Sequence, residues 1–294
     1  MTTLSADLRG WLPFRSRSTP PPVPSSTVPV LAWSLRKVVP GYSGSCLRAM
    51  KAPGGSEQDI GFDSSGRLDE TAFGSFIGGS DAFLRRWYNQ GSAGASGDML
   101  AQSAFLPLLK LGSNRFSFGP FSRPAVDPND GPMDMADSAA ARFSTASMTV
   151  MAVIIPSASS TQAEHILGFL NHWSVRAIPT QRSSFRYKDA AGTIRQTSGD
   201  ANQMASGQPT RFAWIVTASG STVNLVRRII GRRDTYSFPG GWGSYGSDNC
   251  QLFGRGASSL YTGYAAEVLV FAPALTEQQV QDIEAGQISY YGLA

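Results

Sequence analysis

Charged residues are scarce in this chain. They make up 16% of its 294 residues, against about 25% in an average soluble domain. Clear helical periodicity is also rare, whereas glycine (31 residues) and proline (18 residues) are plentiful. A chain of this length with many turns and few helices predicts an all-β protein with a sizeable core. The low charge fits an ordinary β-sandwich and a surface covered by partner subunits equally well.

Residues that commonly carry chemistry are few. The chain has two histidines, His165 and His172, and two cysteines, Cys46 and Cys250. Two histidines leave few ways to build a Ser-His-Asp triad, and no G-x-S-x-G motif is present. The stretch AEHILGFLNHW predicts two strands with a turn at Asn171, which argues against a helical metal site. We expect no metal and no cofactor. Two free buried thiols are expected, and one long-range disulfide between the two cysteines is the alternative.

Long apolar runs and targeting signals are missing as well. The longest apolar runs, such as MTVMAVII (148–155), have the length of a strand, so we expect no membrane span. The first 14 residues include Asp7 and Arg9 and no uninterrupted apolar segment, so we expect no signal peptide. The net charge of +4 is too small to indicate nucleic-acid binding.

Residues 1–30 do not have the pattern of a folded domain. The segment RSRSTPPPVPSSTVPV (15–30) is rich in proline, which favours an extended, polyproline-II-like chain. Basic, apolar and aromatic side chains precede it. We expect residues 1–30 to anchor the protein to another protein; the alternative is a disordered tail. The side chains expected to make this contact are Arg9, Trp11, Phe14, Arg15, Arg17 and Pro21.

Strand patterns dominate the remainder. MTVMAVIIP (148–156) and GYAAEVLVFAPAL (263–275) predict strands that are buried on both faces. FAWIVTASGSTVNLVRRIIG (212–231) predicts a hairpin. Two helices are expected, a short one within 68–78 and a terminal one within 276–292 that begins with a capping box.

The second part of the chain resembles a concanavalin A-like (laminin-G-like) β-sandwich. The matching pieces are FSRPAVDPNDGPMDMADSAAARFSTASMTVMAVIIPSAS (121–159), the strand AAEVLVF and the closing TEQQVQDIEAGQISYYG. The resemblance covers residues 120–294. It implies a concanavalin A-like sandwich (jelly roll) with a short C-terminal helix, and a structural role for Glu267 in AAEVLVF.

Residues 34–94 resemble the start of the α-L-arabinofuranosidase B catalytic domain, a sandwich of the same class. The matching pieces are YSG (42–44), SCLRAMKA (45–52), QDIGF (58–62), LDE (68–70) and WYNQ (87–90). The two resemblances imply one domain over 31–294, with an arabinofuranosidase-like beginning (31–119) and a laminin-G-like part (120–294). In WYNQGSAG (87–94) Asn89 replaces the acid of the related pattern WYDQSGNG, and we interpret this stretch as scaffold.

A retaining glycosidase needs two carboxyl groups roughly 5 Å apart. None of the acidic residues lies in a motif that matches the catalytic pair of the arabinofuranosidase family, so we expect no enzymatic activity. The acids considered are Asp59, Asp63, Asp69, Glu70, Asp127, Asp130, Asp134, Asp137, Glu164, Asp200 and Glu267.

A binding role rests on aromatic residues around the glycine-rich stretch PGGWGSYG (239–246). Sugars stack their apolar faces on exposed aromatic rings. The candidates for stacking are Trp242, Tyr245, Tyr236 and Trp173, with Asn249 as a polar partner. The alternative is that these rings cover the core or subunit contacts.

Domains with this pairing of parts recur in tail and virion proteins of bacteriophages. The resemblance implies a structural protein of the virion. The preferred interpretation is a tail-associated fibre or appendage that helps the particle attach to glycans on the host surface. A capsid decoration protein, a glycoside hydrolase and a free lectin are the alternatives. We further expect a homotrimer made in the host cytoplasm, bound to tail, portal-proximal or capsid proteins, and with neither nucleic acid nor membrane as a partner.

Overall fold

The computed structural model describes most of the chain. Its described residues are 22–24, 26–52, 54–102, 106–111, 114–115, 117–118, 123–128, 131–143, 147–156, 164–169, 171–178, 182–197, 204, 207–246, 248–254 and 260–293. The side chains expected to anchor the arm lie outside these residues; they are Arg9, Trp11, Phe14, Arg15, Arg17 and Pro21.

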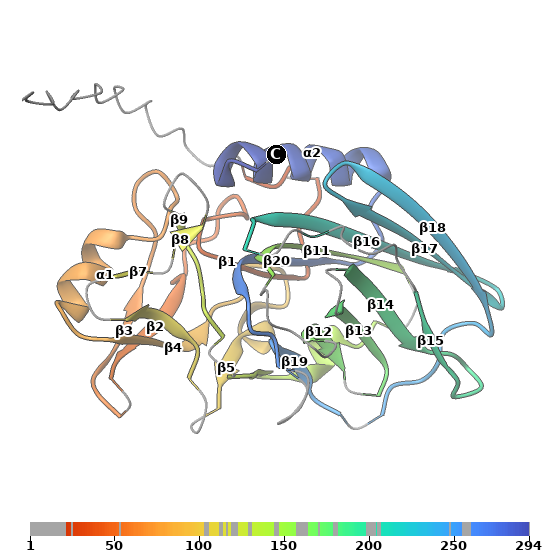
Figure 1. Ribbon diagram of the computed structural model, residues 1–294, viewed down its shortest axis with the longest axis horizontal. Helices are drawn as coiled ribbons and strands as arrows, with labels where there is room; N and C mark the ends of the chain where they lie inside the picture. Colours follow the sequence, from red (N-terminus) through yellow and green to blue (C-terminus); the bar gives the residue numbers. More distant parts are fainter. Residues whose placement is uncertain are drawn as a thin grey trace, which may run out of the picture.

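Two antiparallel sheets pack face to face (Figure 1). The smaller sheet has six strands in the order β1-β20-β11-β16-β17-β18. Their bounds are β1 Leu31–Ser34, β11 Ser147–Ile155, β16 Thr210–Ser219, β17 Thr222–Ile229, β18 Arg232–Pro239 and β20 Tyr264–Phe271. The predicted strands of 148–156 and 263–275 and the hairpin of 212–231 are therefore confirmed.

The larger sheet runs in the order β15-β14-β13-β12-β19-β10-β5-β4-β2-β3; off this path, β6 pairs with β4 and β7 pairs with β6. Its strands are β2 Leu47–Lys51, β3 Glu57–Ile60, β4 Ala82–Trp87, β5 Met99–Ala101, β6 Leu108–Leu111, β7 Asn114–Arg115, β10 Met133–Met135, β12 Glu164–Phe169, β13 Trp173–Ile178, β14 Arg182–Lys188, β15 Ile194–Gln196 and β19 Cys250–Leu252. The short strands β8 Ser117–Phe118 and β9 Arg123–Pro124 form a separate pair. The fold is the all-β sandwich that the sequence predicts.

The hydrophobic core explains why β11 is apolar from Val150 to Ile155. Its inward side chains, among them Val150 and Ile154, belong to the main core between the sheets. An outward side chain, Met151, belongs to a second cluster that includes Val280 and Ile283 of helix α2, Glu277–Tyr291. Because layers cover both faces of β11, most of its residues are apolar, and the buried Thr149 hydroxyl accepts from the Leu275 N–H at 2.9 Å.

Helix α2 covers the outer face of the six-stranded sheet, as Figure 1 shows. It begins with the predicted capping box, in which the Thr276 and Gln279 side chains each bond the other's backbone N–H. It ends at Gly292, whose φ of 65° suits glycine. The short helix α1, Glu70–Ile77, is capped by Asp69, whose side chain accepts from the Ala72 N–H at 2.9 Å. Both predicted helices are confirmed.

A buried ion pair lies between the six-stranded sheet and α2. Glu267 of β20 accepts hydrogen bonds from Arg36, at 2.7 and 3.1 Å, and from Ser34 at 2.9 Å. Gln287 and Tyr291 of α2 donate to the same carboxylate at 3.0 and 3.2 Å. Burial alone raises the pKa of Glu267, but the Arg36 charge and these donors outweigh it and lower the pKa below its usual value. Glu267 is structural, as its sequence context implies.

The WYNQ stretch joins β1 to the end of β4. Asn89 accepts from the N–H of Ala32 at 2.7 Å and from that of Gly91 at 2.9 Å. Gln90 accepts from the Val38 N–H at 2.8 Å and donates to the carbonyl of Ser34 at 3.0 Å. Both amides are buried. These side chains satisfy backbone groups that have no strand partner, in agreement with their interpretation as scaffold.

Part of the predicted arm lies against the sandwich. Val23 is buried beside residues of β20 and α2, and its N–H donates to the carbonyl of Val38 at 2.8 Å. Thr27 is also buried. Residues 22–30 therefore pack on the domain wherever they are described.

The two cysteines, Cys46 and Cys250, are free and buried, as predicted. Burial raises the pKa of both thiols. Within the described ranges, no helix has both the length and the hydropathy needed to cross a membrane.

Candidate functional site

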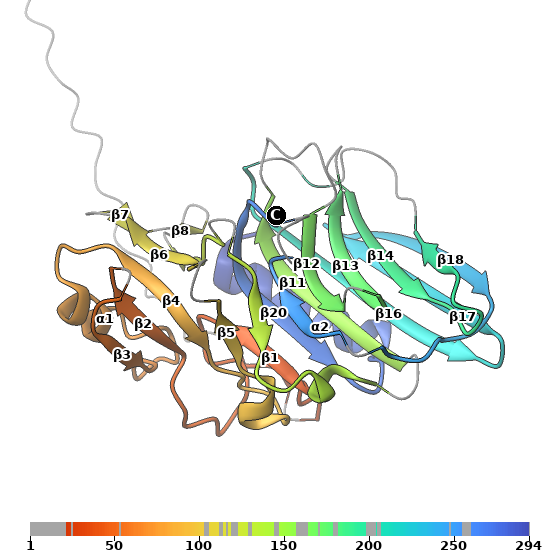
Figure 2. The same cartoon turned by 90° about the horizontal axis from the view of Figure 1, so that it is seen from below.

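A line of polar residues crosses the outer face of the large sheet. Figure 2 views the molecule from this side, with α2 behind the sheets. The strand register places one residue of each strand opposite the next. All but two of these residues are polar. This polar row consists of Asp59, Arg48, Arg86, Leu100, Asp134, Gln251, Gly168, Ser174, Arg186 and Gln196.

Strand alternation explains why these side chains face outward. Their neighbours along the chain, such as Leu47, Met99 and Met133, are fully buried in the main core. Because successive side chains of a strand point to opposite faces, the residues between them point away from the core. The polar row therefore lies on the face of the large sheet that no other layer of described residues covers.

Asp134 occupies the centre of the polar row and is only partly buried. One carboxylate oxygen accepts from the side-chain amide of Gln102 at 3.0 Å, and the other accepts from that of Gln251 at 2.8 Å. The two amides fix the carboxylate and add carbonyl oxygens beside it. A fixed group of carboxylate and amide side chains is suited to hydrogen-bonding the hydroxyls of a polar ligand.

A second charged group lies at the β2–β4 end. Asp59 accepts from Arg48 at 2.7 and 2.9 Å and from the Tyr88 hydroxyl at 2.7 Å. The Arg48 hydrogen bonds are the main reason why the pKa of Asp59 is lowered. Asp98 lies 3.7 Å from Arg86 and is buried, and this burial raises its pKa. Two carboxyl groups with opposite pKa shifts are a pattern found in acid–base sites.

The carboxylates of the polar row are far from one another. Asp59 on β3 and Asp134 on β10 are four strand spacings apart, which is roughly 19 Å. A retaining glycosidase needs roughly 5 Å, and an inverting one up to roughly 9.5 Å. A hydrolytic pair that includes Asp134 would therefore draw its second carboxylate from outside the row. Two acids considered from the sequence, Asp130 and Asp200, lie outside the described residues.

Most other acids considered from the sequence have structural roles. Asp63 accepts from the backbone N–H groups of Ser65 and Arg67, each at 2.9 Å. Asp137 caps the short 3-10 helix at Ser138–Ala141. Glu164 accepts from the Thr262 hydroxyl at 2.6 Å. These carboxylates stabilise turns and strand ends.

The predicted stacking residues belong largely to the core. Trp173 is 0% exposed, so neither of its ring faces is open to a ligand, and its assignment to sugar stacking is corrected. Trp242 stacks on Tyr187 with centroids 5.3 Å apart, and Tyr245 stacks on His172 at 3.8 Å. These rings pack on one another and close one end of the sandwich, as the alternative interpretation expects.

The other two candidates lie apart from this aromatic group. Tyr236 of β18 packs against Trp214, with centroids 5.9 Å apart, and is partly buried. Asn249 is exposed just before β19. The structure therefore does not bring the five predicted binding residues together around one open surface.

His172 has one ring nitrogen without a partner. Its Nε2 lies 2.8 Å from the carbonyl of Gly243, which can only accept, so Nε2 carries the hydrogen. Nδ1 is buried and makes no hydrogen bond. Burial lowers the pKa of His172, and Lys188 lowers it further. The ring is therefore neutral near pH 7.

Two hollows lie away from the polar row. One, of about 370 Å³, is lined by loops on either side of Tyr42 and Phe62. The Tyr42 hydroxyl donates to the carbonyl of Ser45 at 2.9 Å, and its ring meets Phe62 edge-on. Because its polar groups already bind the loops themselves, this hollow is a weaker candidate than the polar row.

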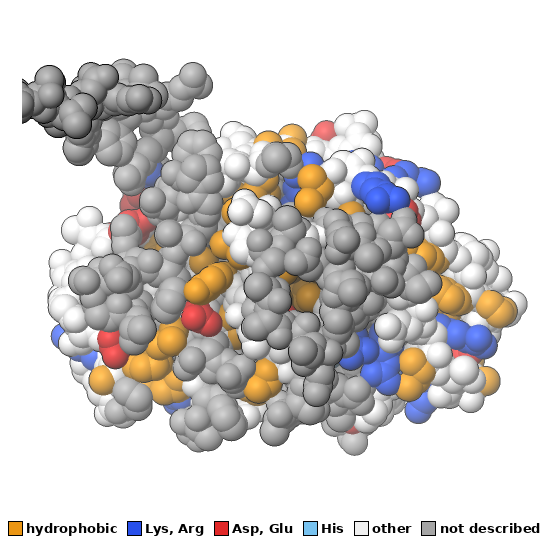
Figure 3. Space-filling model, in the orientation of Figure 1, with side chains coloured by type: hydrophobic (Ala, Val, Ile, Leu, Met, Phe, Trp, Pro, Cys, Tyr) orange, Lys and Arg blue, Asp and Glu red, His pale blue; other side chains and the backbone are white. Residues whose placement is uncertain are grey.

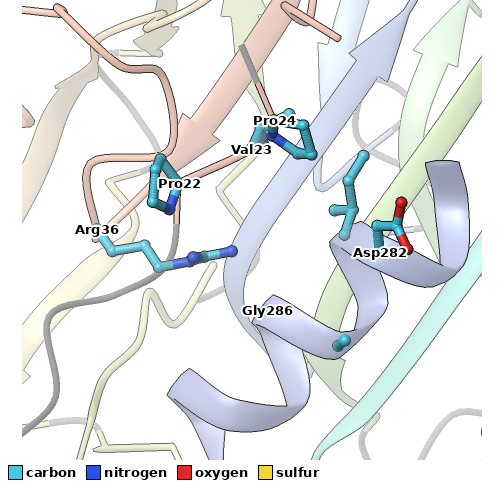
Figure 4. A pocket seen from close by; sticks show the side chains of 8 residues that line it. Pro22, Val23, Pro24, Arg36, Asp282 and Gly286 are labelled. Atoms are coloured by element: carbon cyan, nitrogen blue, oxygen red, sulfur yellow. The ribbon is translucent and has the colours of Figure 1, made fainter. Parts of the chain in front are cut away.

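The second hollow, of about 320 Å³, lies on the α2 side (Figure 4). The Arg36 side chain lies between Pro22 and α2, but its guanidinium is bound to Glu267. One wall comes from the N-terminal segment and the other from α2; the lining residues are Pro22, Val23, Pro24, Arg36, Asp282, Ile283, Ala285 and Gly286. This groove marks the place where the N-terminal segment reaches the domain.

The fold is similar to that of family GH54 arabinofuranosidases. An arabinofuranosidase complexed with arabinofuranosyl-α-1,2-xylobiose superimposes with a TM-score of 0.62 at 12% identity, over 91% of this chain and 64% of that one. A GH54 α-L-arabinofuranosidase soaked with a cyclic sulfate inhibitor gives 0.55 at 11% identity, over the same shares. The chain thus spans less than two thirds of the length of these enzymes.

More distant similarities add no functional argument. A domain of the bacteriophage CBA120 tailspike protein 2 matches with a TM-score of only 0.36 at 18% identity, over 58% of this chain and 28% of that one. No protein-family model matches the chain, and no curated protein matches its sequence.

The expectation of a non-enzymatic protein is corrected by these comparisons. It rested on the lack of a recognisable catalytic motif, yet the structural match to an arabinofuranosidase covers 91% of this chain. The sequence resemblance of residues 34–94 to the arabinofuranosidase domain agrees with this similarity of fold.

Proposed function

We propose that this protein acts on saccharides along the polar row, with Asp134, Gln102 and Gln251 as the group that contacts the sugar. The observation that carries the proposal is the placement of a partly exposed carboxylate between two amide donors, at 3.0 and 2.8 Å, in the middle of the mostly polar row. Carboxylate and amide side chains together can both accept from and donate to vicinal hydroxyls.

Arabinofuranosyl glycans are the first substrates to test, because the arabinofuranosidases named above share the fold over most of this chain. The same site could hydrolyse these glycans or bind them without hydrolysis, and the test distinguishes the two activities. The purified protein is offered 4-nitrophenyl α-L-arabinofuranoside and arabinofuranosyl-substituted xylo-oligosaccharides. Release of nitrophenol and calorimetric binding are measured.

The decisive variant is Asp134→Asn, which keeps the shape of the side chain and removes its charge. Hydrolysis or binding should fall at least tenfold, because a charged hydrogen bond contributes about 1.5–3 kcal/mol. Asp282→Asn is the matched control, since Asp282 is exposed on α2 at the opposite face. Saccharide turnover or binding that persists unchanged in Asp134→Asn would overturn the assignment of the site.

We also propose that the residues before Pro22 anchor the protein to a virion, in a tail-associated appendage or, alternatively, as a capsid decoration. The support is the basic, aromatic and proline-rich composition of that segment. Deleting residues 1–21 keeps Val23, which is buried in the domain, so the sandwich should remain folded. Loss of incorporation into particles is the expected result, and full incorporation of the truncated protein contradicts the proposal.

A further inference from the structure

The larger of the two hollows, of about 370 Å³, lies at one end of the β2–β3 pair. At this end the Cys46 N–H donates to the carbonyl of Ile60 at 2.8 Å. Beyond these two residues, residues 42–45 form one wall of the hollow and residues 61–64 form another. We call the space between these walls the loop hollow.

The first wall is held in shape by Tyr42. Its hydroxyl donates to the carbonyl of Ser45 at 2.9 Å and so bridges the loop. Gly44 leaves room for this bridge, because a Cβ at this position would lie 2.5 Å from the Tyr42 hydroxyl oxygen. Burial raises the pKa of Tyr42 to about 12, so the hydroxyl keeps its proton near pH 7. A ligand therefore meets a loop that is already ordered, which favours binding.

The second wall is held in shape by Asp63. One carboxylate oxygen accepts from the backbone N–H groups of Ser65 and Arg67, each at 2.9 Å, and from the Ser65 hydroxyl at 2.7 Å. The other oxygen lies 3.4 Å from the Arg67 guanidinium. The Asp63 carboxylate thus serves its own turn, and Arg67 balances its charge.

Lys37 lines the loop hollow beside this turn, where its N–H donates to the carbonyl of Gly66 at 2.7 Å. Its ammonium group forms no ion pair and no hydrogen bond with any described residue. Lys37 is partly exposed. The loop hollow therefore contains a positive charge that the protein does not use elsewhere.

Three serine hydroxyls of the lining are also free. Within the part of the chain that the structure describes, those of Ser43, Ser45 and Ser64 have no hydrogen-bond partner, and neither do the backbone N–H groups of residues 43–45. All of these residues are at least partly exposed. Because an ammonium group and backbone N–H groups can only donate, the loop hollow is suited to a ligand that is rich in acceptors.

We propose that the loop hollow binds the phosphate or sulfate group of a small ligand, with Lys37 as the counter-charge. A tetrahedral oxyanion has acceptor oxygens in several directions and can meet donors on both walls, whereas a carboxylate has two oxygens in one plane. Lysine and successive backbone N–H groups are recurrent contacts of phosphate in proteins. A volume of about 370 Å³ falls in the range of ligand sites, roughly 300–1,000 Å³, and leaves room for a sugar-sized group beside the anion.

The general charge of the molecule does not explain such a preference. In Figure 3 the end that carries α1, β2 and β3 in Figure 1 is mainly white, with only scattered blue and red side chains among its coloured residues. A broad basic surface attracts any polyanion. On the face shown no such surface covers this end, so we expect the preference to depend on individual groups of the loop hollow.

Calorimetry on the full chain tests the proposal with inorganic phosphate, inorganic sulfate, glucose 6-phosphate and glucose. At least one of the three anions should bind with a Kd of about 1 mM or below, and glucose should bind at least tenfold more weakly. Tighter binding of glucose 6-phosphate than of inorganic phosphate supports a ligand whose sugar also occupies the hollow. Equal binding of the two supports the free anion as the ligand.

Two kinds of variant assign the binding to the loop hollow. Lys37→Gln should weaken binding of the anion roughly tenfold, because it removes a charged hydrogen bond. Lys51→Gln is the matched control, since Lys51 is a partly exposed lysine of β2 outside the lining. Ser43→Ala and Ser64→Ala should each weaken binding a few-fold. Thermal melts confirm that each variant is folded.

The shape of the first wall is tested with glycine variants. Gly44→Ala should weaken anion binding several-fold, because the new Cβ displaces the Tyr42 hydroxyl from its place. Gly79→Ala is the control, since a Cβ at Gly79 would meet nothing within 4 Å. Saturating anion should also slow acetylation of Lys37 and leave acetylation of Lys51 unchanged, both measured by mass spectrometry.

Two results would overturn the inference. One is the absence of binding by all three anions at millimolar concentration. The other is an equal effect of Lys37→Gln and Lys51→Gln, which would show attraction to positive charge in general. Neither result bears on the proposed saccharide function, because Asp134 lies on β10 and is not part of the loop hollow.

Discussion

Two carboxylates on opposite sides of the sandwich show how the same chemical group serves different ends. Glu267, under α2, is 0% exposed and accepts from Arg36, Ser34, Gln287 and Tyr291. Asp134, on the outer face of the large sheet, is partly exposed and accepts from only two amides. The first carboxylate is fully used by the protein itself. The second keeps hydrogen-bonding capacity for a ligand.

The difference follows from what covers each sheet. Helix α2 excludes water from the outer face of the six-stranded sheet, so a charge there is tolerated only with a complete set of partners. No helix of the described residues covers the outer face of the large sheet (Figures 1 and 2). Asp134 on that face is partly exposed, so water can satisfy what its two amide partners leave open. A binding site is therefore expected on the large sheet.

The largest loss of stability that tests this comparison is expected for Glu267→Ala. The substitution leaves Arg36 buried without its counter-charge, and breaking a buried pair in this way costs about 3–5 kcal/mol. Unfolding by urea should show this loss in the free energy of unfolding. Asp59→Asn is the control: its partner Arg48 is 37% exposed, and a pair this exposed contributes only about 0–1 kcal/mol. Similar losses for both variants would contradict the contrast between the two faces.

A somewhat smaller effect is expected for Asn89→Ala, which tests the scaffold of the WYNQ stretch. The change leaves the N–H groups of Ala32 and Gly91 without their acceptor. A buried group left unsatisfied costs about 1–3 kcal/mol, so the free energy of unfolding should fall by about 2–3 kcal/mol. Saccharide binding at Asp134 should be unchanged at temperatures where the variant is folded, which separates scaffold from site.

Sequence reasoning succeeded where one stretch of chain determines the structure. The continuous β-rich run of β11 predicts a strand with both faces covered, and Thr276 and Gln279 predict the start of α2. Asn89 could be interpreted as scaffold because an Asn side chain can accept from backbone within its own turn, here from the Gly91 N–H; its bond to Ala32, 57 residues away, could not be foreseen. Local patterns of this kind do not depend on which strands later become neighbours.

The polar row is a different case. Its residues come one from each strand, and alternation predicts which face Asp134 occupies but not that Gln102 and Gln251 lie beside it. Asp98 and Arg86 were missed for the same reason. Trp173 was misassigned because an aromatic residue next to a turn has the same sequence pattern whether its ring points into the core or into solvent.

The smallest effect concerns His172, whose Nδ1 is buried without a partner on the large-sheet side. Because burial lowers the pKa of His172 below the ordinary value of 6.5, the unfolded chain takes up a proton at a higher pH than the folded protein does. The contribution to stability is therefore complete above pH 6.5 and is lost as the pH falls through 6.5 toward the lowered pKa. His172→Gln should remove this part of the pH dependence, measured as the difference between the free energies of unfolding in urea at pH 7.5 and pH 5.

The stability that the wild type loses at pH 5 should be smaller than the stability lost in Glu267→Ala, since protonation leaves the histidine ring in place. An identical pH dependence in the wild type and in His172→Gln would contradict this prediction. It would show that His172 Nδ1 has a hydrogen-bond partner in solution, as the Glu267 carboxylate has on the α2 side.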